Sequence, residues 1–433
     1  MTFNRRQFLA TTMAATGLPR LAFGAPVTLR AAPVTAQILP EGDGTTQLLG
    51  FNGSSPGPEL RYRVGDTVDI RFENGIDEGS AIHWHGIRID NAMDGVPYMT
   101  QPMVESGENF DYRFTLPDAG TYWYHSHHRS WEQVARGLYG PLIVEEENAP
   151  AVDHDITVMV DDWRIERTGE IIEDFGNRHD FSHAGRLGTF ARTIASVGEV
   201  RKGDRVRLRL INTATARVFP LEISGISGKV VALDGMPLGA PEDIGPLMMA
   251  PAQRVDIIAD VTDTINFVFP TRQGPYVLGD IKVVGENPAP NASPIAALPA
   301  ANAPMPSAQP DHTLVLRMQG GAMGGAHDGG DIWSFNGVSG MTAAPWQTFT
   351  RGQTVRIQLV NDTSFPHGIH LHGHHFYEVL EDDSLGPYRD TTLLQRQQTR
   401  DIICVFDNPG KWLMHCHMLG HQASGMKTWV EVV

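Results

Sequence analysis

Four short histidine clusters are the part of this 433-residue chain best equipped for chemistry. Each contains a His-x-His pair, and side chains at positions i and i+2 of a strand point the same way, so each pair presents two imidazoles to one side. The pairs are His83 with His85, His125 with His127, His370 with His372, and His415 with His417. Imidazole suits copper, zinc, iron and nickel, and eight imidazoles in one place need more than one metal ion. Strands often carry one such pair by chance, but four pairs predict a metal centre.

Cys416 stands between the two histidines of the last pair, so we expect its thiolate on the opposite face of that strand. There it can meet His367, which precedes the third pair, and His421, five residues after the cysteine. Met426 can add a weak thioether. Two imidazoles, one thiolate and a long axial methionine make a blue-copper electron-transfer site. A disulfide to Cys404, the other cysteine, would consume this thiolate, so we predict none and expect Cys404 in a buried strand.

The segments that must position these clusters are written three times. The pattern Gly-x-x-Val-x-Ile/Leu-x-Phe/Leu-x-Asn runs over residues 65–74, 203–212 and 352–361, and its alternation predicts a half-buried strand in each copy. A His-x-His pair follows the first and third copies, whereas the second has Glu222-Ile223-Ser224 at that place. We therefore predict three homologous β domains, with the metal chemistry in the outer two.

Composition marks the limits of these domains. The many glycines (45) and prolines (29) favour short strands and turns over long helices. Runs rich in proline, alanine or acids separate the repeated units. The predicted parts are an export signal at 1–25, a first domain at 26–147, a second at 148–286, a Pro/Ala-rich linker at 287–310 and a third domain at 311–433.

The first residues predict where the protein works. Arg5-Arg6-Gln7-Phe8-Leu9, followed by a mild apolar stretch and small residues, is typical of a twin-arginine signal that is removed on export, here to the periplasm. No later segment approaches the roughly 20 apolar residues that cross a bilayer. The net charge of −16 leaves no electrostatic footprint for nucleic acid.

Taken together, these motifs resemble those of the multicopper oxidases, especially bacterial laccase-like members. The matching signatures are His83-Trp84-His85-Gly86, His125-Ser126-His127, His367-Gly368-Ile369-His370-Leu371-His372-Gly373, and His415-Cys416-His417-x3-His421-x4-Met426. The likeness spans the whole mature chain. It departs at Pro366, which precedes His367 where many relatives have the proline after that histidine, and the ligand spacing is unchanged. The resemblance implies an all-β fold of three consecutive cupredoxin-like Greek-key β-sandwich domains.

The resemblance also implies four copper ions and their ligands. Type 1 copper would be held by His367, Cys416, His421 and Met426. Type 2 copper would be held by His83 and His370. The type 3 pair would be held by His85, His125, His127, His372, His415 and His417. Such an enzyme couples four one-electron oxidations of a donor at type 1 copper to reduction of O2 to water at the other three.

Some of these residues, His367 and Cys416 among them, and one carboxylate, Asp94, are expected to take part in the reaction itself. His367 and His421 are expected to approach the surface, where one of them accepts the donor's electron, and Cys416 passes it along the backbone to His415 and His417. O2 reduction also needs protons. Asp94 matches the family's carboxylate beside type 2 copper, although an Asp before a Gly is also a common turn residue.

Proton supply to the type 3 pair is expected to be slower or differently routed, because Gln422 stands where many bacterial relatives have Glu. His374 and His375, just past a ligand run, are expected behind the ligands or at the surface.

The sequence leaves the electron donor open. One hypothesis is a laccase-like oxidase of phenols and aromatic amines; another is a periplasmic Cu(I) oxidase. Cu(I) oxidases carry a methionine-rich insertion early in the third domain, where this chain has only Met318 and Met323, then His327 and Asp328, which a flexible Gly-rich loop explains better. Three other methionines, Met93, Met99 and Met103, are expected in the core.

A third hypothesis is a copper-free structural member of the family. The complete ligand set argues against it. The expected partners are a small one-electron donor and O2, or Cu(I) under the second hypothesis, with no nucleic acid. By analogy with three-domain relatives, a monomer is expected.

Overall fold

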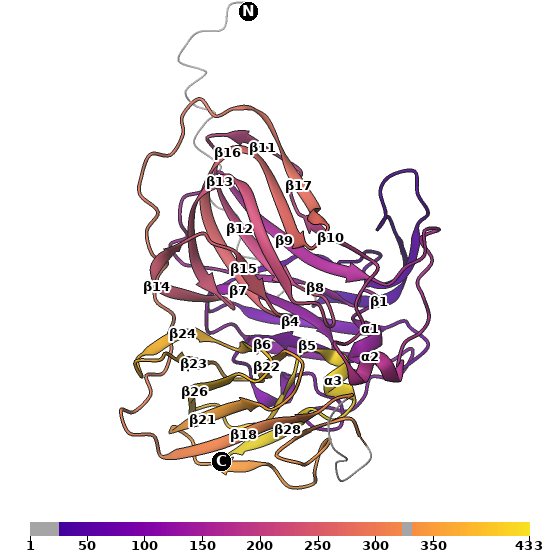
Figure 1. Cartoon of the computed structure of the whole chain (residues 1–433), viewed down its shortest axis with the longest axis vertical. Helices are drawn as coiled ribbons and strands as arrows, with labels where there is room; N and C mark the ends of the chain where they lie inside the picture. The colour runs from indigo at the N-terminus through magenta and orange to yellow at the C-terminus, as the bar shows by residue number, and fades with distance from the viewer. Residues whose placement is uncertain (1–25, 323–330) are drawn as a thin grey trace, which may run out of the picture.

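The computed structural model describes residues 26–322 and 331–433, and the predicted export signal lies outside them. Strand accounts for 52% of the structure and helix for 4%, which confirms the all-β prediction. Figure 1 shows the middle part of the chain at the top, the N-terminal part beside and below it, and the C-terminal part at the bottom. No described helix has the length and apolar character needed to span a bilayer.

The first domain is a sandwich of two four-stranded sheets, with strand orders β2-β1-β4-β6 and β3-β8-β7-β5. Its strands are β1 (Val27–Ala36), β2 (Thr46–Phe51), β3 (Leu60–Arg63), β4 (Thr67–Asn74), β5 (Ile82–His85), β6 (Asn109–Thr115), β7 (Gly120–Ser126) and β8 (Tyr139–Glu145). A short 3-10 helix, η1 (Asn91–Met93), and one helical turn, α1 (Ser130–Gln133), lie between strands.

The second domain is built on one nine-stranded sheet whose main path is β10-β9-β12-β16-β13-β14. Its elements are β9 (His154–Trp163), α2 (Arg178–Ser182), β10 (Phe190–Ala195), β11 (Glu199–Lys202), β12 (Arg205–Asn212), β13 (Phe219–Leu233), β14 (Met236–Asp243), β15 (Leu247–Met249), β16 (Arg254–Thr271) and β17 (Gly274–Glu286).

The third domain pairs a six-stranded sheet, β19-β18-β21-β26-β23-β24, with a five-stranded one, β20-β28-β27-β22-β25. Its elements are β18 (His312–Gly320), β19 (Trp333–Phe335), β20 (Gln347–Phe349), β21 (Gln353–Asn361), β22 (His367–Leu371), β23 (Phe376–Val379), β24 (Leu385–Arg389), β25 (Thr391–Leu394), β26 (Thr399–Phe406), β27 (Gly410–Cys416), α3 (Leu419–Ala423) and β28 (Lys427–Val432). No described strand crosses a predicted domain limit, and the limits themselves remain predictions.

The three copies of the repeated pattern are strands β4, β12 and β21. Burial alternates along β4, as expected of a strand with one face on the core. Strand β12 differs, because every one of its residues is buried and the expected half-burial is wrong there. The physical reason is that its polar side chains are paired: Arg207 contacts Asp256 at 2.7 Å, and Arg209 contacts Asp155 at 2.6 Å.

The outer domains share one apolar core. A single cluster of buried side chains runs from Leu29 and Trp84 of the first domain to Trp412 and Val432 of the third, whereas most of the second domain packs around its own cluster. Because close-packed interiors resist deformation, this shared core fixes the first and third domains relative to one another. In Figure 1, β5 and β22 lie where these two domains meet.

The cysteines and most of the methionines lie as expected. Cys404 is buried in β26, and both cysteines are free thiols, so the prediction of no disulfide is confirmed. Met318 and Met103 are buried, and Met93 packs against the core. The expectation for Met99 is wrong, because that side chain lines a surface pocket. Met323, His327 and Asp328 lie outside the described residues.

Candidate metal centres

Strand pairing brings the predicted histidines together two by two. In the first domain β5 and β7 are antiparallel neighbours, with His83 directly opposite His125. In the third domain β22 and β27 are paired in the same way, with His370 opposite His415. The second histidine of three of the pairs follows directly after its strand, at His127, His372 and His417. Since the two domains share a core, these strands face one another and the eight imidazoles converge.

The convergence produces three sets of three histidines, and within each set the candidate ligand atoms lie within 4.8 Å of one another. The sets are His83, His85 and His370; His85, His125 and His417; and His127, His372 and His415. Every set takes residues from both outer domains. Neither domain can complete a set alone.

Unpaired nitrogens show that these imidazoles fit metal ions. One ring nitrogen each of His83, His85, His125 and His370 is buried with no hydrogen-bond partner, and both nitrogens of His417 are. Buried polar atoms without partners are costly, and copper accepts imidazole nitrogen readily. Hydrogen bonds at the other nitrogen fix the rings: His125 Nδ1 donates to the Ser126 carbonyl (2.9 Å) and His370 Nδ1 to the Asp390 carbonyl (3.0 Å).

Burial also keeps the imidazoles neutral, which ligation requires. Removal from water lowers the pKa of His85, His125, His372 and His417 well below the usual value, and the neighbouring histidines lower it further. The lone pairs are therefore free at neutral pH.

Asp94 lies inside this cluster and is wholly buried. One carboxylate oxygen accepts a hydrogen bond from His372 Nδ1 at 2.9 Å, and the other lies 3.4 Å from His83 Nδ1 without any hydrogen-bond partner. Gly95 makes this position possible, because it has a φ of +82° and a Cβ there would collide with the Ile82 carbonyl. Asp94 thus contacts one histidine of the predicted type 2 set and one of the type 3 set.

Asp390, which was not predicted from the sequence, lies behind the histidine cluster and contacts two of its members, His85 and His370. It is wholly buried, and its Oδ1 lies 3.1 Å from His85 Nε2. Burial works to raise the pKa of this carboxyl, but the Arg254 guanidinium holds it well below its usual range. His374 and His375 are both buried close by, behind the ligands and away from the surface.

Arg254 ties the three domains together at this point. From β16 of the second domain it donates to the Thr121 carbonyl of the first (3.0 Å) and to both carboxylate oxygens of Asp390 in the third (3.0 and 2.5 Å). Both side chains of the pair are inaccessible to solvent.

We expect Arg254→Met to lower the free energy of unfolding by about 3–5 kcal/mol, because the Asp390 carboxylate would stay buried without its cation. Urea unfolding of the copper-free protein measures this change. Arg71→Met is the matched control: it removes a solvent-exposed pair with Asp111 (2.7 Å), and we expect it to leave the free energy of unfolding nearly unchanged, because water screens such pairs. Equal losses in both variants would contradict the anchoring role of Arg254.

A second cluster is formed by His367, Cys416 and His421. Cys416 Sγ lies 3.6 Å from His367 Nδ1 and 3.8 Å from His421 Nδ1. Their outer nitrogens are hydrogen-bonded, His367 Nε2 with Thr363 Oγ1 (2.8 Å) and His421 Nε2 to a backbone carbonyl, which leaves both Nδ1 atoms for a metal ion. Burial raises the pKa of the Cys416 thiol to about 12, so a bound cation is needed to hold it as thiolate.

Two methionines are candidates for the thioether of this cluster. Met426 is wholly buried in the same core, and its carbonyl accepts from the Cys416 amide at 3.1 Å. The sulfur of Met418, which the sequence analysis missed, lies 3.6 Å from Cys416 Sγ and 3.2 Å from the Gly368 amide nitrogen. The ligand role of Met426 remains a prediction.

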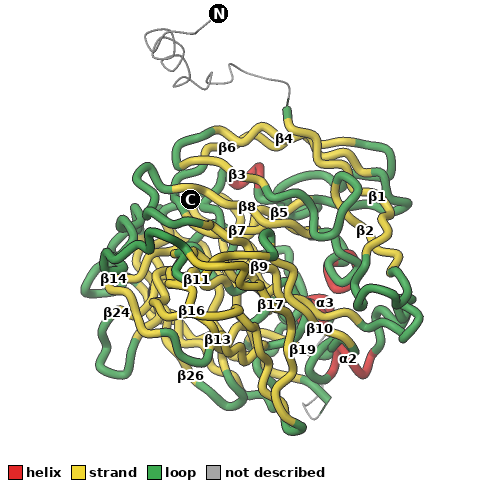
Figure 2. Tube along the Cα trace, turned by 90° about the horizontal axis from the view of Figure 1, so that it is seen from above, coloured by secondary structure: helices red, strands yellow, loops and turns green. Residues whose placement is uncertain are grey.

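The expectation that His367 and His421 approach the surface is wrong, because both are wholly buried. Helix α2 and the residues after it, from the second domain, cover them: the His183 carbonyl accepts from His421 Nε2 at 2.7 Å. The Trp333 ring lies against the His421 ring, with centroids 4.4 Å apart. In Figure 2, α2 and α3 lie close together at one side of the molecule.

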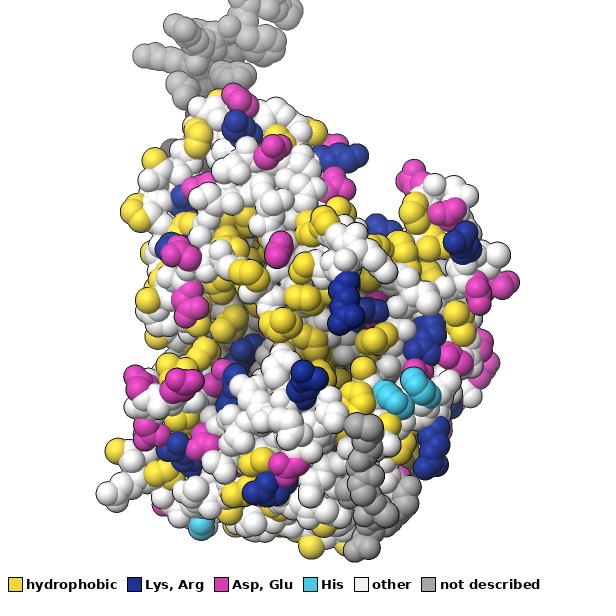
Figure 3. All heavy atoms as spheres, viewed as in Figure 1, with side chains coloured by type: hydrophobic (Ala, Val, Ile, Leu, Met, Phe, Trp, Pro, Cys, Tyr) yellow, Lys and Arg dark blue, Asp and Glu magenta, His cyan; other side chains and the backbone are white. Residues whose placement is uncertain are grey.

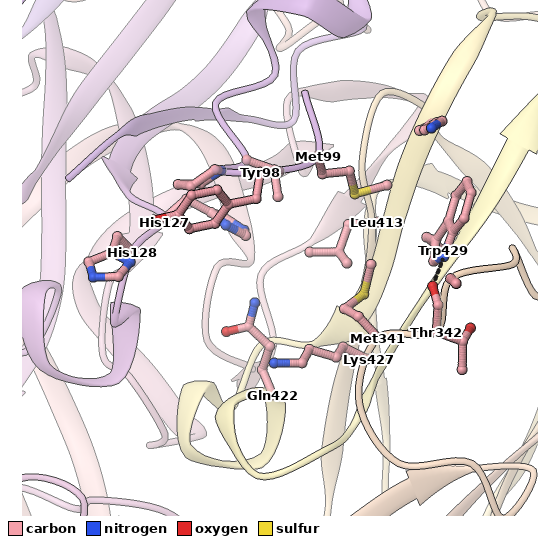
Figure 4. Close-up of a pocket in the computed structure, with 14 residues that line it drawn as sticks. Tyr98, Met99, His127, His128, Met341, Thr342, Leu413, Gln422, Lys427 and Trp429 are labelled. Atoms are coloured by element: carbon pink, nitrogen blue, oxygen red, sulfur yellow. Dashed lines mark hydrogen bonds between the residues drawn. The ribbon is translucent and has the colours of Figure 1, made fainter. Parts of the chain in front are cut away.

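A pocket of about 500 Å³ opens between the outer domains and reaches His127 (Figure 4). Met99 from the first domain and Met341 from the third both point into it, on either side of Leu413 in this view. Gln422, Lys411 and Lys427 line it as well. None of its described lining residues is Asp or Glu. The pocket gives small molecules an approach to the histidine cluster.

Comparison with known proteins identifies the family. Three models described as multicopper oxidase match residues 34–149, 155–278 and 307–433. The crystal structure of a multi-copper oxidase from Pseudomonas thermotolerans is 33% identical, covers 94% of this chain and all of that one, and superposes with a TM-score of 0.83. The chain belongs to the multicopper oxidase family.

Further proteins are similar to this multicopper oxidase in sequence or in fold. Lac15, from a marine microbial metagenome, is 57% identical over 94% of this chain and all of its own, with a TM-score of 0.82. The multicopper oxidase MmcO of Mycobacterium tuberculosis is 29% identical over 92% of this chain and 87% of its own length. Matches at 26% and 27% identity are named Laccase-1 and copper resistance protein A homolog. The protein has the cupredoxin-like fold and is a copper-dependent oxidoreductase that uses O2 as acceptor.

Proposed function

We propose that the protein is a laccase-like oxidase that takes single electrons from phenols or aromatic amines at the His367–Cys416–His421 site and reduces O2 to water at the eight-histidine site. Bound copper ions supply the one-electron redox chemistry, four in all with the type 1, type 2 and type 3 ligands predicted from the sequence. The observation that carries the proposal is the tripeptide His415-Cys416-His417. Cys416 lies in the first site, and His415 and His417 lie in the second.

The backbone of this tripeptide is the connection between the two sites. Cys416 Sγ faces His367 and His421, and the side chains on either side of it face the other way. The Cys416 carbonyl also accepts from His415 Nδ1 at 3.0 Å, which adds a hydrogen-bonded path beside the covalent one. Both paths are buried, so electrons travel without exposure to solvent.

The surroundings of the electron-accepting site favour an organic donor over Cu(I). Cu(I) prefers soft thioether and thiolate ligands. Thr363, the His183 carbonyl and Trp333 contact the outer edges of His367 and His421, and none of these three groups has a sulfur atom. These contacts therefore offer Cu(I) none of the soft ligands that it prefers.

Proton delivery rests on Asp94 in this proposal. Its carboxylate accepts from His372 of the predicted type 3 set and lies 3.4 Å from His83 of the predicted type 2 set. The pocket beside His127 supports the idea by its composition, since Gln422 lines it where an acid would be expected, next to the Lys427 ammonium. Water in that pocket has no carboxylate among the described lining residues to exchange protons with.

Three further features belong to the proposal. The twin-arginine pattern at Arg5 and Arg6 would direct the protein to the periplasm. The chain would act as a monomer, because the outer domains of one chain already complete every histidine set. Its partners would be a small donor and O2.

Oxygen uptake by the copper-loaded protein tests the donor class. We would supply 2,6-dimethoxyphenol, p-phenylenediamine and Cu(I) side by side and compare kcat/KM. Higher values for the two organic donors support the proposal, and turnover with Cu(I) alone would show a metal oxidase instead. Elemental analysis should find about four copper ions per chain, and a copper-free protein of full stability would indicate the structural alternative.

A further inference from the structure

The cover over the electron-accepting site comes from the domain that holds no predicted copper ligand. Residues 177–185 of the second domain lie over α3 of the third, where Phe181 packs against Gly420. The Phe181 carbonyl accepts from Trp333 Nε1 at 2.6 Å, and the His183 carbonyl accepts from His421 Nε2 at 2.7 Å. These bonds fix the cover on the two rings that surround the site.

The His183 carbonyl is therefore the outermost group of a continuous path by which electrons reach His421. His421 carries no exposed surface, so a donor cannot touch this ligand directly. A hydrogen bond of 2.7 Å from a buried imidazole to a carbonyl is a short, fixed contact through which an electron can pass. This contact is made by the backbone of residue 183 and not by its side chain.

The imidazole of His183 presents a hydrogen-bond acceptor to solvent. Its Nδ1 lies 2.8 Å from the His179 carbonyl, and because a carbonyl only accepts, Nδ1 carries the proton. In the neutral ring Nε2 is then a bare lone pair. Among the described residues no hydrogen bond is made to this Nε2, and the ring is partly exposed.

Aromatic surfaces adjoin this acceptor. The exposed ring of His179 stacks on His183 with centroids 4.0 Å apart and planes 14° apart, and Phe365 meets the same ring edge-on at 5.8 Å. On the face in Figure 3, two histidine side chains stand side by side on the surface at the place that α2 occupies in Figure 1. Flat aromatic molecules pack on such surfaces.

We propose that His183 is the docking residue for the electron donor: its Nε2 accepts a hydrogen bond from the O–H of a phenol or the N–H of an aryl amine. The backbone carbonyl of the same residue passes the donor's electron to His421. A phenol so bound loses one electron to the site and its hydroxyl proton to water, and leaves as a phenoxyl radical. This inference rests on the proposed oxidation of phenols and aryl amines and names the group that selects them.

Binding to the His183→Phe variant is the direct test. Phenylalanine keeps an aromatic ring and the backbone carbonyl but removes the Nε2 acceptor, together with the Nδ1–H that bonds the His179 carbonyl. We would titrate the copper-loaded protein with 4-cyanophenol, which resists oxidation, in a calorimeter without O2. The dissociation constant should rise about tenfold in the variant, the usual effect of one lost hydrogen bond. The methyl ether 4-methoxybenzonitrile, which has no O–H, should bind equally weakly to both proteins.

Kinetics provide a second, independent readout. p-Phenylenediamine has N–H groups and its tetramethyl derivative has none, so only the former should lose kcat/KM in His183→Phe, about tenfold and mainly through KM. The absorption of the type 1 site should stay unchanged. His312→Phe, at an exposed position at the start of β18, is the control and should alter neither donor. If His183→Phe does not load copper, His183→Ala takes its place.

The outcomes separate this inference from the proposed function. Unchanged binding of 4-cyanophenol, or equal losses for both diamines, would overturn the role of His183 while phenol oxidation by the natural protein stands. If the natural protein oxidises neither phenols nor aryl amines, the proposed function fails and this inference with it.

Discussion

Cys416→Ser is expected to abolish both the visible absorption, at about 600 nm, that a copper–thiolate bond gives and all oxidase activity. Serine is nearly the same size, so the strand pairing of β27 is kept, but its hydroxyl does not bind copper as a thiolate does. The His367–Cys416–His421 cluster would lose its strongest ligand. Electrons from the donor would also lose their path along the tripeptide. Visible spectra and oxygen uptake of the copper-loaded variant measure the two effects.

Cys404→Ser is the control for this substitution. Cys404 is also wholly buried, and its thiol lies 3.4 Å from the His375 carbonyl, which a serine hydroxyl can bond as well. This variant should keep its colour and most of its activity. An unchanged visible spectrum in Cys416→Ser would rule out the assignment of the type 1 site.

Asp94→Asn is expected to slow reduction of O2 by about 10² or more while leaving the type 1 site reducible. The amide has the same shape, but it cannot release and take up protons as a carboxyl group can. In one of its two orientations it would also present an N–H to His372 Nδ1, from which the carboxylate now accepts a hydrogen bond. Stopped-flow spectra separate the two half-reactions: bleaching by a donor without O2 should stay fast, and the return of colour with O2 should become slow.

Asp90→Asn is the matched control, because Asp90 is exposed and precedes the same short helix, η1. It should leave both half-reactions unchanged. Full turnover of Asp94→Asn would show that Asp94 is not on the proton route. Its role would then be structural, as the residue of the turn that precedes Gly95.

Much of this arrangement was predictable because it depends on local rules. The period of two along a strand predicted which neighbours of Cys416 face away from it, and the threefold pattern predicted β4, β12 and β21. The same rule predicted that His83 and His85 reach a common centre. Each of these inferences uses residues a few positions apart, where backbone geometry alone decides the direction of a side chain.

Contacts between domains could not be predicted in this way. Asp390 and Arg254 are 136 residues apart in the chain, and nothing in the local pattern of either indicates a partner. His421 is covered by a backbone carbonyl 238 residues away. Every residue has such a carbonyl, so no residue type in the sequence indicates this contact. Met418 was missed for a different reason: two residues after Cys416, it occupies a place for which no spacing rule assigns a ligand.

The sharing of histidine sets between the outer domains sets an order of events during synthesis. The first domain leaves the ribosome with His83, His85, His125 and His127 in place, but the residues that complete their sets lie more than 240 positions later. An early copper ion would find only partial sites, which bind weakly and release it. Stable loading therefore has to wait until the third domain has folded against the first. Copper bound at the shared sets would then oppose separation of the two domains, so that removing the metal should make the chain easier to open at this one interface.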